Sequence, residues 1–319
     1  MSRRGGPAAW VALASVCFFW GTTYLAIRIS IETLPPGFVV CTRFLLSGSI
    51  LLIAARLRGA HLPRGRDLRV ACITGITVLG IGNAAVVYAE QIIPSGLASL
   101  FTILSPFWMV GLEAAMGGEP LHAPALLGMA VGLGGCALLL LPGAGGSHQS
   151  MLLGFLIVEL GGLGWTVGSL IQRRQPTRAH PIVVGAVQQL AAGLVYIPVV
   201  LFIPEHAIVF SQRSVLAVLY LVIFGSIVGY SAYIFAMDRL PVAIVSIYSY
   251  CNAAVAVFLG WLFFREPFGM REFIGMLIVF AGVAIVKYRT PGSAPPARRE
   301  WRRGRMTLAN DVRNSADPG

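Results

Sequence analysis

The chain has 319 residues, of which 56% are hydrophobic and only 12% are charged. A soluble domain carries roughly 25% charged residues, because its surface must be solvated, so this composition excludes an ordinary soluble protein. The net charge of +11 would suggest a nucleic-acid partner in a soluble chain. Here the basic residues lie between apolar runs, where they orient a membrane protein, and we expect an integral membrane protein that binds no nucleic acid.

Ten apolar segments follow one another along the chain, each near the ~20 residues that cross a hydrocarbon core. The connectors are short, so we predict an all-α bundle of ten transmembrane helices. The first segment follows Arg3 and Arg4 as in a signal peptide, but it is longer, lacks a convincing cleavage site, and is interpreted as a spanning helix. The predicted segments are 8–30, 37–57, 68–90, 96–117, 123–142, 151–172, 181–203, 214–237, 242–264 and 270–288.

The basic residues predict the orientation of these helices. With the N-terminus in the cytoplasm, 19 Lys and Arg residues fall inside and four outside, and 11 remain inside when those from Lys287 onward are left out. Such an excess marks the cytoplasmic side. We therefore expect a multi-pass protein of the cell inner membrane with both termini in the cytoplasm.

The two halves of the chain are similar in sequence. We predict a first five-helix repeat over 8–142, a second over 151–288, and a basic, Pro-rich, disordered tail over 289–319. Because five is an odd number of spans, the second repeat must be inverted in the membrane, an architecture typical of alternating-access transporters. A scaffold built from duplicated helices is the alternative. The matching residues are Pro94/Pro241, Ser99/Ser246, Glu119-Pro120/Glu266-Pro267, Gly128-Met129/Gly275-Met276 and Gly135/Gly282 at an offset of 147, and Trp20/Trp165 and Gly48/Gly193 at an offset of 145.

Three stretches of the chain, Trp20–Leu52, Tyr88–Leu140 and Phe235–Val286, resemble the EamA family of the drug/metabolite transporter superfamily, and the resemblance covers residues 8–288. It implies ten helices with cytoplasmic termini and secondary transport, commonly outward, of amino acids and related metabolites. It does not name the substrate. Gln188 lies opposite Arg43 in the repeat alignment, which breaks the symmetry of any anion contact.

Two charged residues fall deep within predicted helices, where each is a functional hypothesis. At 1.5 Å per residue, Glu159 lies about 12 Å and Arg43 about 9 Å from the same membrane face. One interpretation is a cavity that binds a zwitterion, with Arg43 facing a carboxylate and Glu159 an amino group. The alternative is a direct Arg43–Glu159 pair that neutralises both charges.

Trp20 and Trp165 occupy equivalent positions near mid-membrane, away from the interfaces where Trp usually gathers, and we expect them to line the cavity. Other polar side chains at membrane depth complete the candidate substrate site, although some must join helices instead. These are Tyr24, Asn83, Tyr88, Gln188, Tyr230, Tyr248 and Asn252, with Gln189 beside them.

The remaining ionisable residues receive no substrate role. Glu113 is expected to reach the interface, and Glu90 and Asp238 fall at helix ends. The five cysteines lie in apolar runs without metal-ligand spacing, and the five histidines lie in or beside loops. We therefore expect no metal and no cofactor.

Other functional classes leave a sequence signature that this chain lacks. It contains no HExxH, GxSxG or DxD motif of a membrane-embedded enzyme and no Walker A sequence of an ATP-driven pump. No repeated filter segment indicates a channel. The small-xxx-small spacings indicate close packing and not dimerisation, so a monomer is the simplest assembly. We predict a secondary exporter of small metabolites, with amino acids as the first candidates and other metabolites or cationic drugs as the alternative; the rival classes are an enzyme and a non-transporting scaffold.

The orientation can be tested with two matched substitutions in a variant that lacks the native cysteines. His61→Cys in the 58–67 connector should resist an impermeant maleimide in intact cells and react after permeabilisation. His206→Cys, in a connector on the opposite side, should react in intact cells. The reverse pattern would contradict the predicted orientation.

Overall fold

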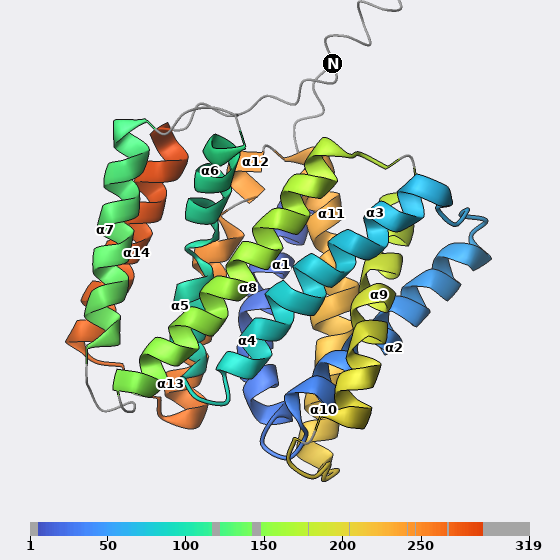
Figure 1. Ribbon diagram of the computed structural model, residues 1–319, viewed down its shortest axis with the longest axis horizontal. Coiled ribbons are helices and arrows are strands. Elements are labelled where there is room, and N and C mark those ends of the chain that lie inside the picture. The colour runs from blue at the N-terminus through green and yellow to red at the C-terminus, as the bar shows by residue number, and fades with distance from the viewer. Residues whose placement is uncertain are drawn as a thin grey trace, which may run out of the picture. The chain divides into compact units, whose positions relative to one another are not determined.

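The computed structural model describes residues 6–116, 122–141, 148–177, 179–203, 205–240, 242–245, 247–266 and 268–289. Over these residues the protein is helical, with no strand (Figure 1). The described helices up to Lys287 form one compact unit. The predicted tail beyond Arg289 lies outside the described residues, and so does the Glu119-Pro120 pair.

The first half contains helices over all five of its predicted segments. The third segment is continuous but changes its winding, since a π-helix joins two α-helices, and the fourth is interrupted after Thr102. The elements are α1 (Pro7–Ser30), α2 (Pro36–Leu57), α3 (Gly65–Gly75), η1 (Ile76–Asn83), α4 (Ala84–Ala89), α5 (Ser95–Thr102), α6 (Ser105–Ala115) and α7 (Ala123–Leu140).

The second half follows the same order. Its third segment again contains a π-helix, and its fourth is again interrupted. The elements are α8 (His148–Arg174), α9 (Pro181–Phe202), α10 (Gln212–Tyr220), η2 (Leu221–Val228), α11 (Gly229–Arg239), α12 (Val242–Val245), α13 (Tyr248–Phe264) and α14 (Met270–Arg289).

Eight helical stretches within the described residues are long and apolar enough to cross a membrane. The helix Tyr248–Phe264 is apolar but shorter, and α14 carries Arg271 and Glu272 at its start and Lys287 and Arg289 at its end. The protein is thus an all-helical membrane protein, while a total of ten spans stays a prediction.

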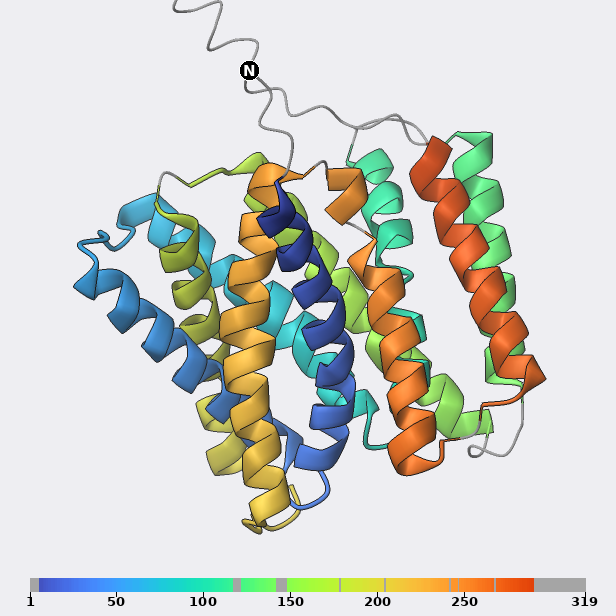
Figure 2. The ribbon, with the colours of Figure 1, turned by 180° about the vertical axis from the view of Figure 1, so that it is seen from behind.

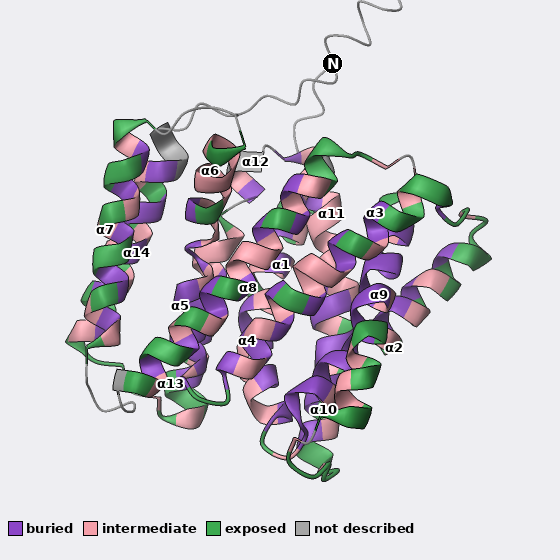
Figure 3. Ribbon diagram, viewed as in Figure 1, coloured by how far each residue is buried: buried purple, intermediate pink, exposed green. Residues whose placement is uncertain are grey.

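The outer faces of these helices are apolar, as contact with lipid requires. Leu57 of α2 is 84% exposed, Phe202 of α9 80% and Leu127 of α7 59%. Figure 3 shows exposed residues recurring along α7 and α8, while buried residues gather where helices meet. In water such a surface would aggregate, so the exposed leucines and phenylalanines indicate a hydrocarbon surrounding.

Glycines allow α2 and α9 to pack closely and in the same way from both sides. A methyl group added at Gly48 would lie 2.9 Å from the backbone nitrogen of Leu190, and one added at Gly193 would lie 2.8 Å from that of Leu45. At the offset of 145, Gly48 corresponds to Gly193 and Leu45 to Leu190. The glycine of each half therefore packs against the equivalent leucine of the other half.

A second pair of helices repeats this reciprocity. A methyl group at Gly128 of α7 would lie 2.7 Å from the carbonyl oxygen of Gly282 in α14, and one at Gly135 would lie 3.0 Å from that of Gly275. The offset of 147 exchanges these two contacts. Figures 1 and 2 both show α7 and α14 side by side.

The two π-helices also correspond, since Ile76–Asn83 and Leu221–Val228 differ by 145 at both ends. A π-helix is rare and often lies at a functional site. Both π-helices face helices of the other half: η1 packs against α8 and α9, and η2 against α1 and α2. The equivalent tryptophans take part, because Trp20 lies over Gly229 and Trp165 over Gly82.

The close approach of α2 and α9 predicts a specific sensitivity to a single methyl group. Gly48→Ala should destabilise the protein by about 1–3 kcal/mol, because the neighbouring atoms are backbone and cannot turn away. The control is Gly134→Ala in α7, where an added methyl group meets nothing within 4 Å. That change should be neutral or stabilising, because Ala favours helix. Thermal unfolding in detergent measures both, and equal midpoints would contradict the prediction.

Candidate functional site

Arg43 is the most deeply buried guanidinium near the centre of the bundle. It projects from α2, is 5% exposed, and has no carboxylate partner among the described residues. Its Nε donates to Ser226 Oγ at 3.0 Å and its Nη1 donates to Asn83 Oδ1 at 3.1 Å. Asn83 ends η1 and Ser226 lies in η2, so one side chain connects the two π-helices.

Trp20 adjoins this cation through the same π-helix. Its Nε1 donates to the carbonyl oxygen of Gly225 at 3.0 Å, and the Arg43 guanidinium lies beside Gly225, where an added methyl group would lie 3.1 Å from Nη2. We call Arg43, Asn83, Ser226, Gly225 and Trp20 the Arg43 cluster. It joins α1, α2, η1 and η2.

An aromatic wall extends from the Arg43 cluster. The Trp20 ring lies 5.2 Å from the rings of Tyr233 and Tyr248, which lie 5.7 Å from each other. Asn252 is buried next to them, and with its amide nitrogen turned inward it donates to the carbonyl oxygens of Cys17 and Tyr248 at 3.0 Å. Five of the predicted site residues are therefore linked through direct contacts or a shared neighbour: Trp20, Arg43, Asn83, Tyr248 and Asn252.

Gln188 and Tyr230 form a separate group. Tyr230 donates to Gln188 Oε1 at 3.2 Å, and Gln188 Nε2 donates to Thr74 Oγ1 at 3.0 Å and to Gln172 Oε1 at 3.1 Å. Gln188 thus occupies the place opposite Arg43 with a satisfied neutral side chain that ties α3, α8, α9 and α11 together. Its neighbour Gln189 accepts a hydrogen bond from Ser47.

Tyr24, Tyr88 and Trp165 have other partners. Tyr24 shares a 3.0 Å hydrogen bond with Thr102, and Tyr88 donates to Glu205 Oε1 at 2.7 Å. Trp165 packs on Gly82. These three side chains join helices and are not in direct contact with Arg43.

Glu159 lies on a different face of α8 from the one that meets η1. Gly161, Gly164 and Gly168 pack against the η1–α4 side, whereas Glu159 Oε2 accepts from Trp108 Nε1 of α6 at 2.7 Å. The direct Arg43–Glu159 pair does not form. Their similar depths did not bring the two charges together, because the depth of a residue does not determine which side of the helix it faces. The other oxygen of Glu159 is buried without a partner.

Some residues of the site carried no sequence signal. Ser226 and Tyr233 were not among the predicted residues, and at the offset of 145 Ser226 corresponds to Ile81, so comparing the two halves does not single it out. Glu113 forms an exposed ion pair with Arg173, as expected for a carboxylate at an interface.

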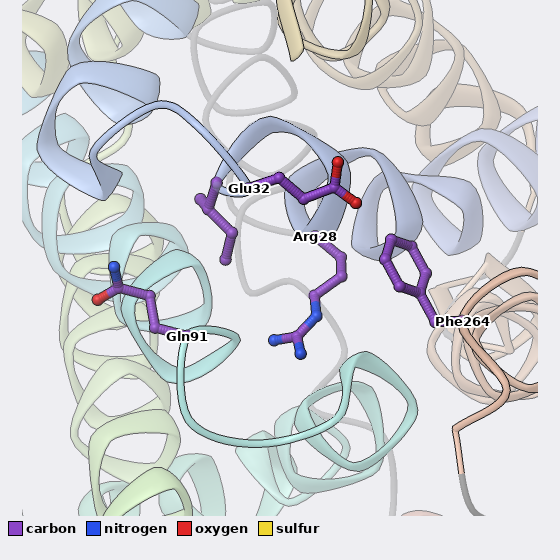
Figure 4. Close-up of a pocket in the computed structure, with 5 residues that line it drawn as sticks. Arg28, Glu32, Gln91 and Phe264 are labelled. Atoms are coloured by element: carbon purple, nitrogen blue, oxygen red, sulfur yellow. The ribbon is translucent and has the colours of Figure 1, made fainter. Parts of the chain in front are cut away.

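A pocket lies at the end of the bundle where α1 and α13 finish. Its volume is about 310 Å³, and its lining residues are Arg28, Ile31, Glu32, Gln91 and Phe264. In Figure 4 the Arg28 side chain extends into the space between Gln91 and Phe264. Arg213 is near, since it pairs with Glu32 at 3.3 Å.

Two comparisons with known proteins concern the whole bundle. A model of the EamA-like transporter family matches residues 8–141 and 152–288. A solved crystal structure is similar at a TM-score of 0.61 and 24% identity, covering 89% of this chain and 98% of the other. That likeness is one of fold.

Sequence relatives are named as transporters. The chain is 33% identical to the uncharacterized inner membrane transporter YedA of Escherichia coli strain K12, covering 88% of this chain and 92% of the relative. It is 25% identical to a probable terminal-alkyne amino-acid exporter of Streptantibioticus cattleyicolor, with 93% and 98% covered, and 24% identical to a probable amino-acid metabolite efflux pump of Escherichia coli strain K12, with 89% and 95% covered.

These names point to a transporter and not to an enzyme. The matched model covers nearly all of the helical unit, and the apolar helices agree with an inner-membrane protein that crosses the bilayer several times. The chain belongs to the EamA-like transporter family.

Proposed function

We propose that this protein exports amino-acid-like metabolites and that Arg43 binds the carboxylate of the substrate. The observation that carries the proposal is a buried guanidinium with neutral partners only. An uncompensated buried charge costs several kcal/mol, and a substrate anion would offset that cost. The names of two relatives, an amino-acid exporter and an amino-acid metabolite efflux pump, agree with this substrate class.

The geometry leaves Arg43 able to accept such a ligand. Its Nη2 makes no hydrogen bond with the described residues, so two N–H groups remain for a carboxylate. Because Gly225 has no side chain, Nη2 can lie close to the main chain of η2, where an added methyl group would be 3.1 Å away. Trp20, Tyr233 and Tyr248 supply rings against which the body of a small metabolite would pack.

The reciprocal contacts support alternating access as the mechanism. Two halves that are inverted repeats can exchange conformations, which opens a central site first to one side and then to the other. The exchange of Gly48–Leu190 for Gly193–Leu45 and the matched π-helices are what such a two-fold relation would produce. We propose ten spans, with the Arg43 cluster between the halves.

The first test compares an amino acid with the amine that it yields on losing its carboxylate. In counterflow with purified protein in liposomes, wild type should transport alanine, leucine or tyrosine at least tenfold better than ethylamine, isopentylamine or tyramine. A lost charged hydrogen bond is worth about 1.5–3 kcal/mol. Arg43→Lys keeps the charge but loses the fork, so it should erase most of this preference, whereas Arg213→Lys on the exposed rim should not. Transport of the amines alone would favour the cationic-drug alternative.

The second test concerns Glu159, which sequence depth placed opposite Arg43. Because its carboxylate faces Trp108 and not η1, we expect Glu159→Gln to keep amino-acid counterflow within a few-fold of wild type. Trp108→Phe removes the donor to Glu159 and is the matched variant. If Glu159→Gln and Trp108→Phe each reduced counterflow as much as Arg43→Lys does, the result would instead support a substrate site that uses both Arg43 and Glu159.

A further inference from the structure

Glu90 is the most unusual carboxylate in the described chain. It follows the last residue of α4, is 0% exposed, and neither of its side-chain oxygens has a hydrogen-bond partner. Buried polar atoms nearly always have a partner, so each exception needs a physical explanation. The sequence places Glu90 at a helix end and gives it no role, and the structure buries it completely.

The groups around Glu90 offset a negative charge only in part, because Arg28 attracts it while burial and Glu266 oppose it. Arg28 of α1 donates from Nη1 to the main-chain oxygen of Glu90 and not to its carboxylate. Glu266, after α13, is a second acidic group acting on it. Tyr24 of α1 also faces it and has its hydroxyl bonded to Thr102. Among the described residues, α2, η1 and α8, which also pack against α4, add no charged group to this environment.

An ionised carboxylate in this place would be costly. Removing a charge from water costs several kcal/mol unless hydrogen bonds or a counter-ion replace the solvent. Glu266 has such replacements, since it accepts from Ser95 N at 2.8 Å, Ser95 Oγ at 2.9 Å and Gly96 N at 3.0 Å. Glu90 has none. Of the two acids, Glu90 is therefore the one whose surroundings favour the neutral form.

A pocket lies next to Glu90 at this end of the bundle. The 310 Å³ pocket is lined by Arg28 and by Gln91, the neighbour of Glu90 (Figure 4). Arg28 lies between the pocket and Glu90. The bonds of Glu266 to Ser95 and Gly96 hold the start of α5 against the end of α13, so releasing them would expose what lies behind.

We propose that Glu90 is a proton-binding site and that closing this end of the bundle requires proton uptake by its carboxylate. On closing, a hydronium ion in the Arg28 pocket gives one proton to a carboxylate oxygen of Glu90: one O–H bond of hydronium breaks, one O–H bond forms on the carboxyl group, and a water molecule remains. On opening, the proton returns to water, and the Arg28 guanidinium is within reach to pair with the ionised group. The closed end binds one proton more than the open end, so a rise in pH favours opening. This inference goes beyond the proposed function and requires no substrate.

Infrared spectroscopy tests the protonation directly. The spectrum of wild type minus that of Glu90→Gln at neutral pH should contain the C=O stretch of a carboxylic acid, which shifts in D₂O. Glu32→Gln is the matched control, because Glu32 is partly exposed and paired with Arg213, and its difference spectrum should contain carboxylate bands. Carboxylate bands in the Glu90 difference would overturn the proposal.

Thiol labelling tests the coupling to opening. Ser99 is 1% exposed and lies one turn inside α5 from Ser95, so Ser99→Cys in a variant lacking the five native cysteines reports access from this end. The labelling rate of Ser99→Cys with native Glu90, divided by its rate in the Glu90→Gln background, cancels the intrinsic pH dependence of the thiol. We expect this ratio to rise with pH, by up to about tenfold per pH unit for one proton. A constant ratio would overturn the coupling.

Neither readout depends on a transported molecule. Failure of amino-acid counterflow would therefore contradict the proposed function and leave this site intact. Carboxylate bands in the Glu90 difference spectrum, with intact counterflow, would contradict the proton site and leave the proposed function standing.

Discussion

The centre of this protein depends on how a buried guanidinium is held. Arg43 donates one hydrogen bond to the end of η1 and one to η2, so the two halves meet around a positive charge that no described acid neutralises. In a hydrocarbon environment that arrangement is stable only if dipoles surround the charge or a ligand completes it. The wider turns of the π-helices matter here because they set the positions of Asn83, Gly225 and Ser226 relative to the regular helices on either side.

The helical segments could be predicted from the sequence because hydrocarbon thickness and hydropathy control them directly. The composition of the site could be predicted only in part. Arg43, Trp20, Asn83 and Tyr248 do meet, but Glu159 turns toward Trp108, since a depth estimate does not specify which face of α8 it occupies. Ser226 was not predicted, because a single serine in an apolar helix has no distinguishing sequence pattern.

Symmetry and asymmetry have different roles in the two halves. The glycine contacts of α2 with α9 and of α7 with α14 are exchanged between the halves, which keeps the framework able to adopt equivalent packings. Arg43 and Gln188 occupy matching positions but are not exchanged. Gln188 is satisfied by Tyr230, Thr74 and Gln172, so only one half presents an unfilled donor. A framework with repeated glycine contacts can therefore carry the proposed carboxylate site, Arg43, in one half only.

The acidic residues near the end of the bundle that holds the Arg28 pocket fall into two kinds, and the difference follows from their partners. Glu205 accepts from Gly37 N and Tyr88, and Glu266 from Ser95 and Gly96, so each charge is bound by donors from another element and fastens two segments together. Glu90 is buried near these hydrogen bonds, and no described group donates a hydrogen bond to its carboxyl oxygens. In the proposed opening, water would reach Glu90, whose carboxyl group would then release its proton. Sensitivity to protons at this end is therefore concentrated in the one acid that makes no structural bond.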